Sequence, residues 1–478
     1  MQRKFLLTAA TAVCLLAPVS LQADTFVVQS REGMTIYSRV TPLSHFKVSF
    51  IGEITFTDDR GDIAAISAAG YLSIERRELL RTRKVVFEPD GTGGVRRTYF
   101  IGSRSRDIDD AARIWIKEAL LETFYMTGLG AESRVRKLLA EGAPLGEILA
   151  EVEPLERDEA RYYYLSALGA SGLPEGDLLE VTQAAGELLT SSFWLGKLLT
   201  EWAGQWAQTG ALAETLLAVT GEISSSYERS RTLIAMVDHL PLEGAAGRRL
   251  VESLGGIASS YEQSRATIGV APALVRHPAA LGDLINAVAS ISSSYEQKRS
   301  LTAIGALPGL SAGHYTLLAD LTGEISSSFE RSTTLISLAE RAVVSDAFVQ
   351  AYLDAVKEIS SSYEQARSLV ALDRRDDLTA EQVVALIRTA GAISSSFETG
   401  RVLARIAART SLGAQELLAY LQVVAGISSS YEQGNAMLAI LDGRELSDEV
   451  IRAALDVARG ISSNSTRSQV LDRLLDRL

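Results

Sequence analysis

From residue 223 onward, polar and apolar positions recur with a fixed period of 34 residues. The marker of the period is Ile-Ser-Ser-Ser-Tyr-Glu at residues 223–228. It returns with its first residue at Ile257, Ile291, Ile325, Ile359, Ile393 and Ile427, with Ala258 replacing one Ser and Phe329 and Phe397 replacing Tyr. Fixed periods of 20 to 50 residues are typical of solenoids, in which each unit buries its apolar face against its neighbours.

Each period predicts two helices. The first begins at the second Ser, which with the Glu forms a Ser-x-x-Glu capping box such as Ser225 with Glu228. The aromatic residue shares a helical stripe with a small residue three positions later and an apolar residue seven positions later, which predicts close packing of neighbouring helices. The second helix ends at the next Ile, through series such as Leu250, Leu254 and Ile257. Each unit is therefore predicted to be an αα-hairpin.

Extending the period in both directions sets the domain limits. Backward steps reach Leu189 and Leu155, and a forward step reaches Ile461, so residues 155–478 contain nine full units and a final half unit. Residues 24–105 instead show short β-branched and aromatic runs separated by Gly and Asp, which predicts a small antiparallel β domain. Residues 106–154 regain helical periodicity and are expected to cap the array. The fold class is thus mainly α, a solenoid preceded by a β domain.

The N-terminus predicts export. Residues 1–23 form a signal peptide, with Arg3 and Lys4 before an apolar stretch and a cleavage site after Ala23. The mature chain is then extracytoplasmic, either periplasmic or secreted. Cys14 lies in the leader, so the mature chain has neither disulfides nor thiol chemistry. No later stretch has the ~20 apolar residues of a membrane span.

Loss of Arg3 and Lys4 with the leader changes the formal net charge from −12 to −14. An acidic balance argues against nucleic-acid or anionic-membrane partners, which both prefer a basic face.

Several short stretches resemble a known family. They are residues 56–75, the Trp-Ile-Lys-Glu-Ala-Leu that starts at Trp115, and residues 130–139. They resemble the C-terminal regions of bacterial antirepressor-type membrane sensor metallopeptidases, where a β segment precedes helical repeats containing Ile-x-Ser-Asp-Tyr. This chain has neither the His-Glu-x-x-His of the peptidase nor its membrane spans. The resemblance therefore implies only an extracytoplasmic sensing or docking part.

The repeat length resembles that of the tetratricopeptide repeat. The unit lacks that family's Trp-x-x-Leu-Gly-x-x-Tyr start and its Pro near the end. Both tetratricopeptide-like and HEAT-like repeats remain open.

Charged columns recur beside the aromatic column and are the candidate binding residues. They are Arg231, Arg265, Arg299, Arg367 and Arg401, with Glu228, Glu262, Glu296, Glu330 and Glu364. We expect each Glu to pair with the Arg three residues later on the helix surface. A ligand-binding surface is the alternative. The aromatic column is expected to pack between units.

Catalytic, cofactor and metal sites are not expected. Repeated copies of a helix cap offer no unique nucleophile with its base, and the four His residues occupy unrelated positions. The enzyme alternative rests on Glu53, Asp58, Asp59 and Asp62, which are otherwise interpreted as a solvated turn.

The sequence therefore predicts a non-enzymatic scaffold that binds a protein or peptide. Its alternative is a sensory component of envelope signalling that docks through the β domain.

Overall fold

The computed structural model describes residues 25–31, 33–79, 81–206, 209–442 and 444–476. The chain divides into two compact units, Met1–Leu173 and Pro174–Leu478. The predicted signal peptide, residues 1–23, lies outside the described residues.

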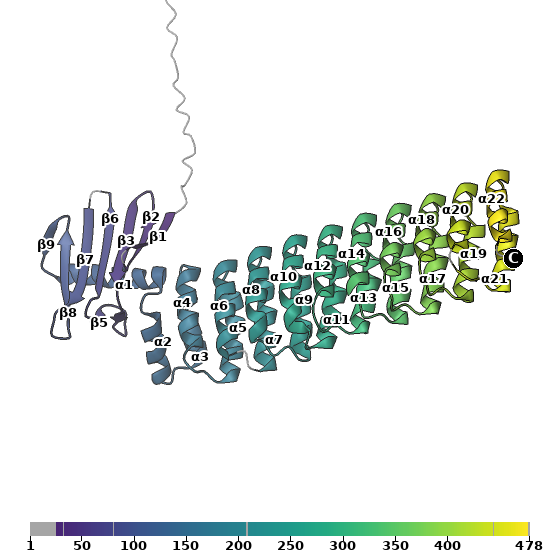
Figure 1. Cartoon of the computed structure of the whole chain (residues 1–478). Coiled ribbons are helices and arrows are strands. Elements are labelled where there is room, and N and C mark those ends of the chain that lie inside the picture. The colour runs from purple at the N-terminus through teal and green to yellow at the C-terminus, as the bar shows by residue number, and fades with distance from the viewer. Residues whose placement is uncertain (1–24, 32, 80, 207–208, 443, 477–478) are drawn as a thin grey trace, which may run out of the picture. The chain divides into compact units, whose positions relative to one another are not determined.

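The first unit contains an antiparallel sheet, as the alternating pattern predicts. Its seven strands follow the order β1-β2-β3-β6-β7-β8-β9, and β4 and β5 form a separate pair. The strands are β1 (Thr25–Arg31), β2 (Met34–Val40), β3 (Ser44–Ile51), β4 (Ile54–Phe56), β5 (Ile63–Ile66), β6 (Tyr71–Glu78), β7 (Arg81–Pro89), β8 (Val95–Ile101) and β9 (Arg104–Arg106) (Figure 1).

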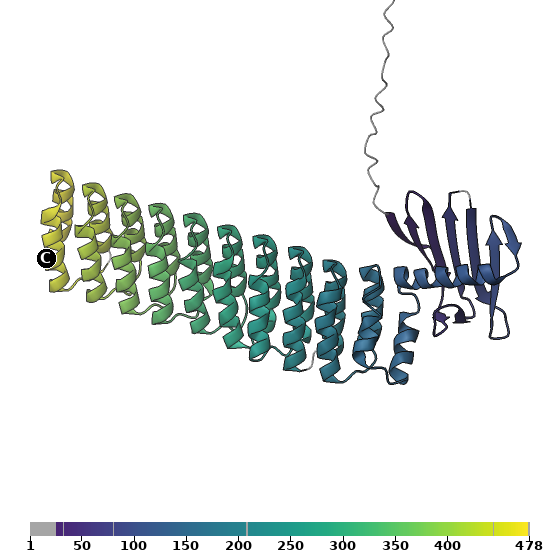
Figure 2. The same ribbon diagram turned by 180° about the vertical axis from the view of Figure 1, so that it is seen from behind.

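One face of the sheet packs against helix α1 (Asp110–Thr127), which lies across the strands (Figure 2). A single register row crosses five strands and is buried throughout, through Tyr37, Val48, Ile74, Val85 and Tyr99. From α1, the core takes Trp115, Ile116, Ala119 and Leu120. Ile114 of the same helix is exposed. The helix is rotated so that Trp115 takes the core position.

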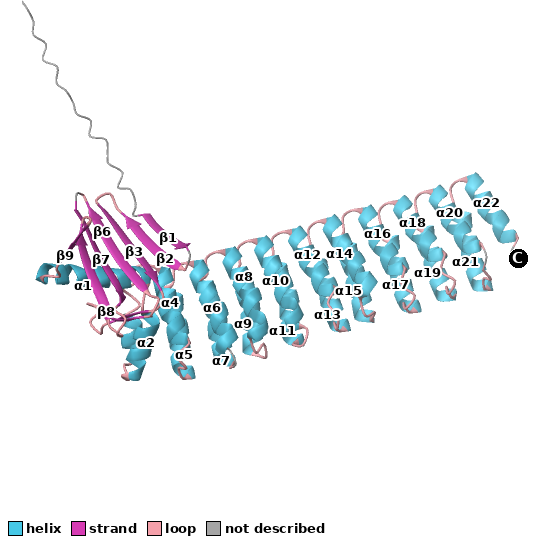
Figure 3. Cartoon of the chain, turned by 60° about the vertical axis from the view of Figure 1, so that its left-hand side comes forward, coloured by secondary structure: helices cyan, strands magenta, loops and turns pink. Residues whose placement is uncertain are grey.

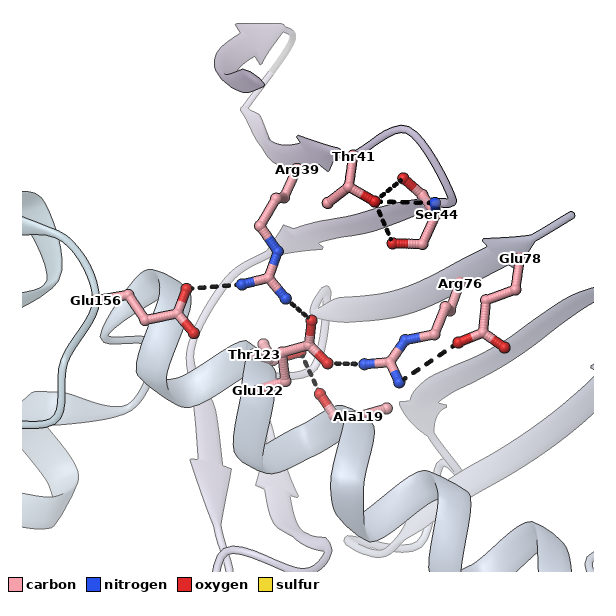
Figure 4. A network of polar contacts seen from close by, with 9 residues as sticks. All are labelled: Arg39, Thr41, Ser44, Arg76, Glu78, Ala119, Glu122, Thr123 and Glu156. Carbon is pink, nitrogen blue, oxygen red and sulfur yellow. Dashed lines mark hydrogen bonds and ion pairs between the residues drawn. The ribbon is translucent and has the colours of Figure 1, made fainter. Parts of the chain in front are cut away.

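Charged side chains also tie α1 to the sheet. Glu122 of α1 pairs with both Arg39 of β2 and Arg76 of β6, and all three side chains are about one-fifth exposed (Figure 4). Arg39 also reaches Glu156 at 2.8 Å. One carboxylate thus bridges two strands that are not neighbours in the sheet.

Three more helices complete the first unit: α2 (Ala131–Ala140), α3 (Leu145–Ala150) and α4 (Asp158–Gly169). Glu151 holds them together, because it accepts from Arg134 at 2.6 Å, pairs with Arg60 at 2.6 Å and accepts from the Tyr164 hydroxyl at 2.8 Å. Burial acts to raise the pKa of Glu151, but the hydrogen bonds from Arg134 and Tyr164 and the charge of Arg60 outweigh it and leave the pKa lowered.

The second unit is a two-layer helical solenoid, as the period predicts. Successive first helices pack on one another, and successive second helices pack on one another. The first helices are α6 (Ser192–Trp206), α8 (Ser226–Met236), α10 (Ser260–Leu274), α12 (Ser294–Gly305), α14 (Ser328–Arg341), α16 (Ser362–Asp373), α18 (Ser396–Ala407), α20 (Ser430–Leu441) and α22 (Asn464–Leu475).

The second helices are α5 (Glu175–Leu188), α7 (Gly210–Val219), α9 (Ala245–Gly255), α11 (Pro278–Ala287), α13 (Ala312–Thr322), α15 (Asp346–Lys357), α17 (Ala380–Gly391), α19 (Ala414–Ala425) and α21 (Asp448–Gly460). Short 3-10 turns lie at η1 (Thr220–Glu222), η2 (Val237–His239) and η3 (Val288–Ser290). Among the described residues of the second unit, α5 is followed by eight hairpins, from α6–α7 to α20–α21, and by the final helix α22. The loops with the repeated serines run along one edge of the row (Figure 3).

Within the described part of the chain, no helix combines the length and apolar character that a membrane span requires.

Candidate binding surface

The three serines of each marker have separate roles at the joint between units. The second Ser is the N-cap of the first helix, and its hydroxyl accepts from the Glu backbone N–H, as Ser225 does from Glu228 at 3.3 Å. The third Ser bonds across to the first Ser of the next unit. These hydroxyl pairs are 2.8–3.1 Å apart at Ser192–Ser224, Ser260–Ser292, Ser294–Ser326, Ser328–Ser360, Ser362–Ser394 and Ser396–Ser428. These serine pairs therefore link neighbouring units along most of the array.

The hydroxyl pair is missing at Ala258, which has no hydroxyl. There Ser226 accepts from the backbone N–H of Ser259 at 3.3 Å, and Ser192 and Ser430 accept the corresponding bonds from Ser225 at 3.1 Å and Ser463 at 3.2 Å. The pattern predicts only a helix cap from these serines. The first and third Ser columns, which have no role in capping, are the signal from which the hydroxyl pairs could have been predicted.

The predicted capping box is only half formed. The Ser hydroxyl caps the helix, but the Glu side chain does not return to the cap amide; it turns toward the Arg three residues later. Reciprocal boxes form instead at second helices, at Ser311 with His314 and at Thr379 with Gln382. The guanidinium group is a charged donor, and it holds the Glu carboxylate in place of the neutral cap amide.

The predicted Glu–Arg pairs are present. Arg231, Arg265, Arg299, Arg367 and Arg401 lie 2.7–3.1 Å from Glu228, Glu262, Glu296, Glu364 and Glu398 respectively. The Glu side chains are only 10–17% exposed, whereas the Arg side chains are 29–42% exposed. Each nearly buried carboxylate therefore fixes a guanidinium group that remains accessible.

Most of these arginines also lie over an aromatic ring of the preceding unit. The distance from the guanidinium carbon to the ring centroid is 5.1–5.6 Å for Arg231 over Phe193, Arg265 over Tyr227, Arg299 over Tyr261 and Arg401 over Tyr363. Arg367 differs, since it lies 5.8 Å from the Tyr363 ring of its own unit. These distances are within the range of cation–π attraction.

Two irregular residues in the sequence compensate for each other. The unit of Glu330 has Thr333 where five other units have Arg and the unit of Glu432 has Asn435, so Glu330 has no cation of its own unit at that position. Lys298 of the preceding unit takes the place of a small residue and reaches Glu330 at 3.1 Å. The small column lies beneath the Glu of the next unit, as at Gly400, where an added Cβ would come within 2.6 Å of the Glu432 carboxylate. A lysine at this position is therefore well placed to supply the missing charge.

The aromatic column is exposed, contrary to the expectation that it packs between units. Tyr227, Tyr261, Tyr295, Phe329, Tyr363, Phe397 and Tyr431 are 51–69% exposed. The cause is position, because each ring stands in the first turn of its helix, two residues after the cap. Cations lie against several of the rings, as Arg265 of the next unit does at Tyr227 and Lys298 of the same unit does at Tyr295. We call this column, its arginines and the exposed serine hydroxyls the aromatic ladder.

The acids of the β domain pair with separate basic residues. Asp59 accepts from Lys117 at 2.9 Å, Asp62 from Arg97 at 2.8 Å, and Asp58 pairs with Lys137. The hydrogen bond from Lys117 holds the pKa of Asp59 well below its usual range. No group of three His, Cys, Asp or Glu able to hold a metal ion occurs among the residues that the structure describes.

The first unit also has a cleft of about 1150 Å³, lined among others by Tyr37, Phe50 and Leu129. The charged side chains in its wall are Glu53, Glu132 and Arg136, and the last two pair with each other at 2.6 Å. Because Glu132 and Arg136 neutralise each other, the charges in the wall of the cleft do not indicate which class of ligand it would bind.

Comparisons with known proteins give no family. No family model matches the chain, and no curated protein matches it. The solved structures that are similar include a "Circular tandem repeat protein with novel repeat topology and enhanced subunit contact surfaces", at 16% identity. The alignment covers 77% of this chain and 78% of that one, with a TM-score of 0.20. A likeness this weak carries no argument about function.

Proposed function

We propose that this chain is a non-enzymatic scaffold, acting in the periplasm or after secretion, that binds a protein or peptide segment along the aromatic ladder. The observation that carries the proposal is the half-exposure of the same aromatic position in seven consecutive units. Large rings left in water at regular intervals are the residues from which binding surfaces draw most of their affinity.

The spacing of the ladder favours an extended partner. Neighbouring packed helices lie about 8–10 Å apart. A polyproline II chain advances about 3.1 Å per residue and has three residues per turn, so one residue in three returns to the same side after about 9.3 Å. Such a segment would place one side chain on each ring, and aromatic-lined surfaces are a known mode of binding such segments.

The chemistry of each unit fits a peptide. The ring offers an apolar face, the guanidinium group can donate to a backbone carbonyl, and the serine hydroxyls can donate or accept. The Glu–Arg pair fixes the guanidinium group before binding, so less conformational freedom is lost when a ligand arrives.

The test is a selection of random peptides on the immobilised chain from Asp24 to Leu478. We expect enrichment of peptides with apolar or Pro residues at every third position. The triple variant Tyr227→Ser, Tyr261→Ser, Tyr295→Ser should lose them.

The matched control is Tyr227→Phe, Tyr261→Phe, Tyr295→Phe. Phe already occupies this column at Phe329 and Phe397, so binding should persist. Equal binding by the Ser and wild-type chains would contradict the proposal.

A further inference from the structure

Several turns of the β-sheet meet at one edge. The β2–β3 and β6–β7 turns are neighbours, because Ser44 pairs with Glu78 and Leu79 donates its N–H to the Leu43 carbonyl at 3.4 Å. The β8–β9 turn lies beside them, since Gly102 donates to the Thr82 carbonyl at 2.8 Å. We call this the turn edge.

Apolar side chains project into water at the turn edge. Leu43 is 69% exposed, Leu79 is 78% exposed, and Val40 at the end of β2 is 42% exposed. The β2–β3 turn is closed by Thr41, whose N–H donates to the Ser44 carbonyl at 2.8 Å and whose hydroxyl accepts from the Ser44 N–H at 2.9 Å (Figure 4). The turn therefore holds Leu43 outward.

Turn geometry does not account for the leucine at position 79. Its φ is +42°, in the left-handed region that suits Gly or Asn and that a large side chain adopts at a cost. A leucine there neither fills the core nor suits the backbone. Its remaining physical property is an exposed apolar surface.

The same edge is basic. Arg77, Arg81 and Arg104 are exposed around the turns, and Glu78 is the exposed carboxylate among them, 4.0 Å from Arg76. Lys and Arg outnumber Asp and Glu between residues 25 and 106, although acidic residues lead by 59 to 47 in the whole chain. The opposite end of the strands has charges of both signs, with Asp90 and Glu53 exposed there together with Arg96. The acidic net charge of the chain conceals this local reversal.

We propose that the turn edge docks on the surface of an anionic lipid bilayer, with Leu43 and Leu79 entering the headgroup region and the arginines binding lipid phosphates. Exposed apolar side chains of a membrane-surface protein enter the boundary between headgroups and acyl chains, and their binding strength grows with the apolar area buried there. Basic residues around the apolar tips add attraction to anionic lipids. The proposal is independent of the aromatic ladder.

Vesicle flotation with the chain from Asp24 to Leu478 tests the proposal, because that chain lacks the apolar leader. We expect flotation with vesicles of phosphatidylcholine and phosphatidylglycerol, and little with phosphatidylcholine alone. The double variant Leu43→Asp, Leu79→Asp should weaken binding by about tenfold or more per leucine. The control Leu475→Asp changes a leucine of the last helix that is 63% exposed, and it should bind as wild type does.

A second variant guards against misfolding of the first. Arg77→Gln, Arg81→Gln, Arg104→Gln should weaken binding to anionic vesicles by about fivefold per charge and reduce its dependence on salt. Failure of the wild-type chain to float, an equal loss in the Leu475 control, or equal binding to both vesicle types would overturn the proposal. The proposal would also be overturned if the chain did not bind vesicles and instead bound a soluble protein through Leu43 and Leu79.

Discussion

The β-sheet and the repeats are stabilised in opposite ways. In the first unit, a single residue such as Glu122 joins two strands that are not neighbours in the sheet. In the repeats, each contact is one of a column, and a neighbouring unit can supply what one unit lacks, as Lys298 does for Glu330. A change in the sheet should therefore have one large local effect, whereas a change in the repeats should have a small one that a second change can cancel.

The largest effect is expected at Glu122. Glu122→Ala leaves Arg39 and Arg76 close together without their shared carboxylate. Because these side chains are about one-fifth exposed, the cost should be about 2–3 kcal/mol, below that of a fully buried pair. Hydrogen exchange should show the loss of protection in β2, β6 and α1. The control Glu118→Ala removes an exposed carboxylate from the same helix, and an equal loss there would show that Glu122 has no special role.

Acid should weaken the first unit through Glu151. The pKa of Glu151 is lowered in the fold, so its stabilising contribution is complete above the unfolded pKa of about 4.3 and is lost as pH falls through the lower folded value. Glu151→Gln should lower the thermal midpoint at pH 7. The difference from wild type should shrink toward pH 3. If the difference in thermal midpoint stayed constant from pH 7 to pH 3, the effect of Glu151→Gln would come from the shape of the side chain and not from the loss of its charge.

The Lys298 exchange tests whether units compensate for one another. Lys298→Ser should cost about 1–2 kcal/mol, because Glu330 is only 16% exposed and loses its cation. Adding Thr333→Arg to that variant should restore most of the loss by recreating the pair found in other units. Urea unfolding of the four chains of this cycle gives the coupling energy. Simple additivity would mean that Glu330 does not need the charge.

The smallest effects are expected at the serine joint. Ser327→Ala removes a helix cap and should cost about 0.5–2 kcal/mol. Ser328→Ala removes only the exposed hydroxyl contact with Ser360 and should cost about 0.5 kcal/mol. If urea unfolding showed a larger loss of stability for Ser328→Ala than for Ser327→Ala, the serine pairs between units would stabilise the joint more than the helix cap does.

The period was sufficient to predict the helices of the array, their pairing and the Glu–Arg contacts. It could not predict whether the aromatic stripe faces a neighbour or water. Periodicity places Tyr227 and Ser230 on one side of a helix, but it does not give the position along the helix axis at which the next helix packs. The structure buries Ser230 and exposes Tyr227. The prediction of a reciprocal capping box was wrong for a related reason. Both the cap amide and the Arg three residues later can donate to the Glu carboxylate, and the sequence does not show which of them does.

In the β domain, alternation predicted the strands but not their order or the turn edge. Leu43 and Leu79 are 36 residues apart and meet only through pairing of β3 with β6. Likewise, Arg39 and Arg76 lie on strands whose shared contact with Glu122 depends on the rotation of α1. Contacts of this kind follow from the register of the whole sheet and have no local signature.

The most direct test of the central claim is the affinity of one selected peptide for chains in which one, two and then three adjacent ladder positions, Tyr227, Tyr261 and Tyr295, are changed to Ser. If the ladder binds an extended segment one unit at a time, each change should raise the Kd by about fivefold, a loss of about 1 kcal/mol per ring. An unchanged Kd, or complete loss at the first substitution with no further effect, would contradict binding along the ladder.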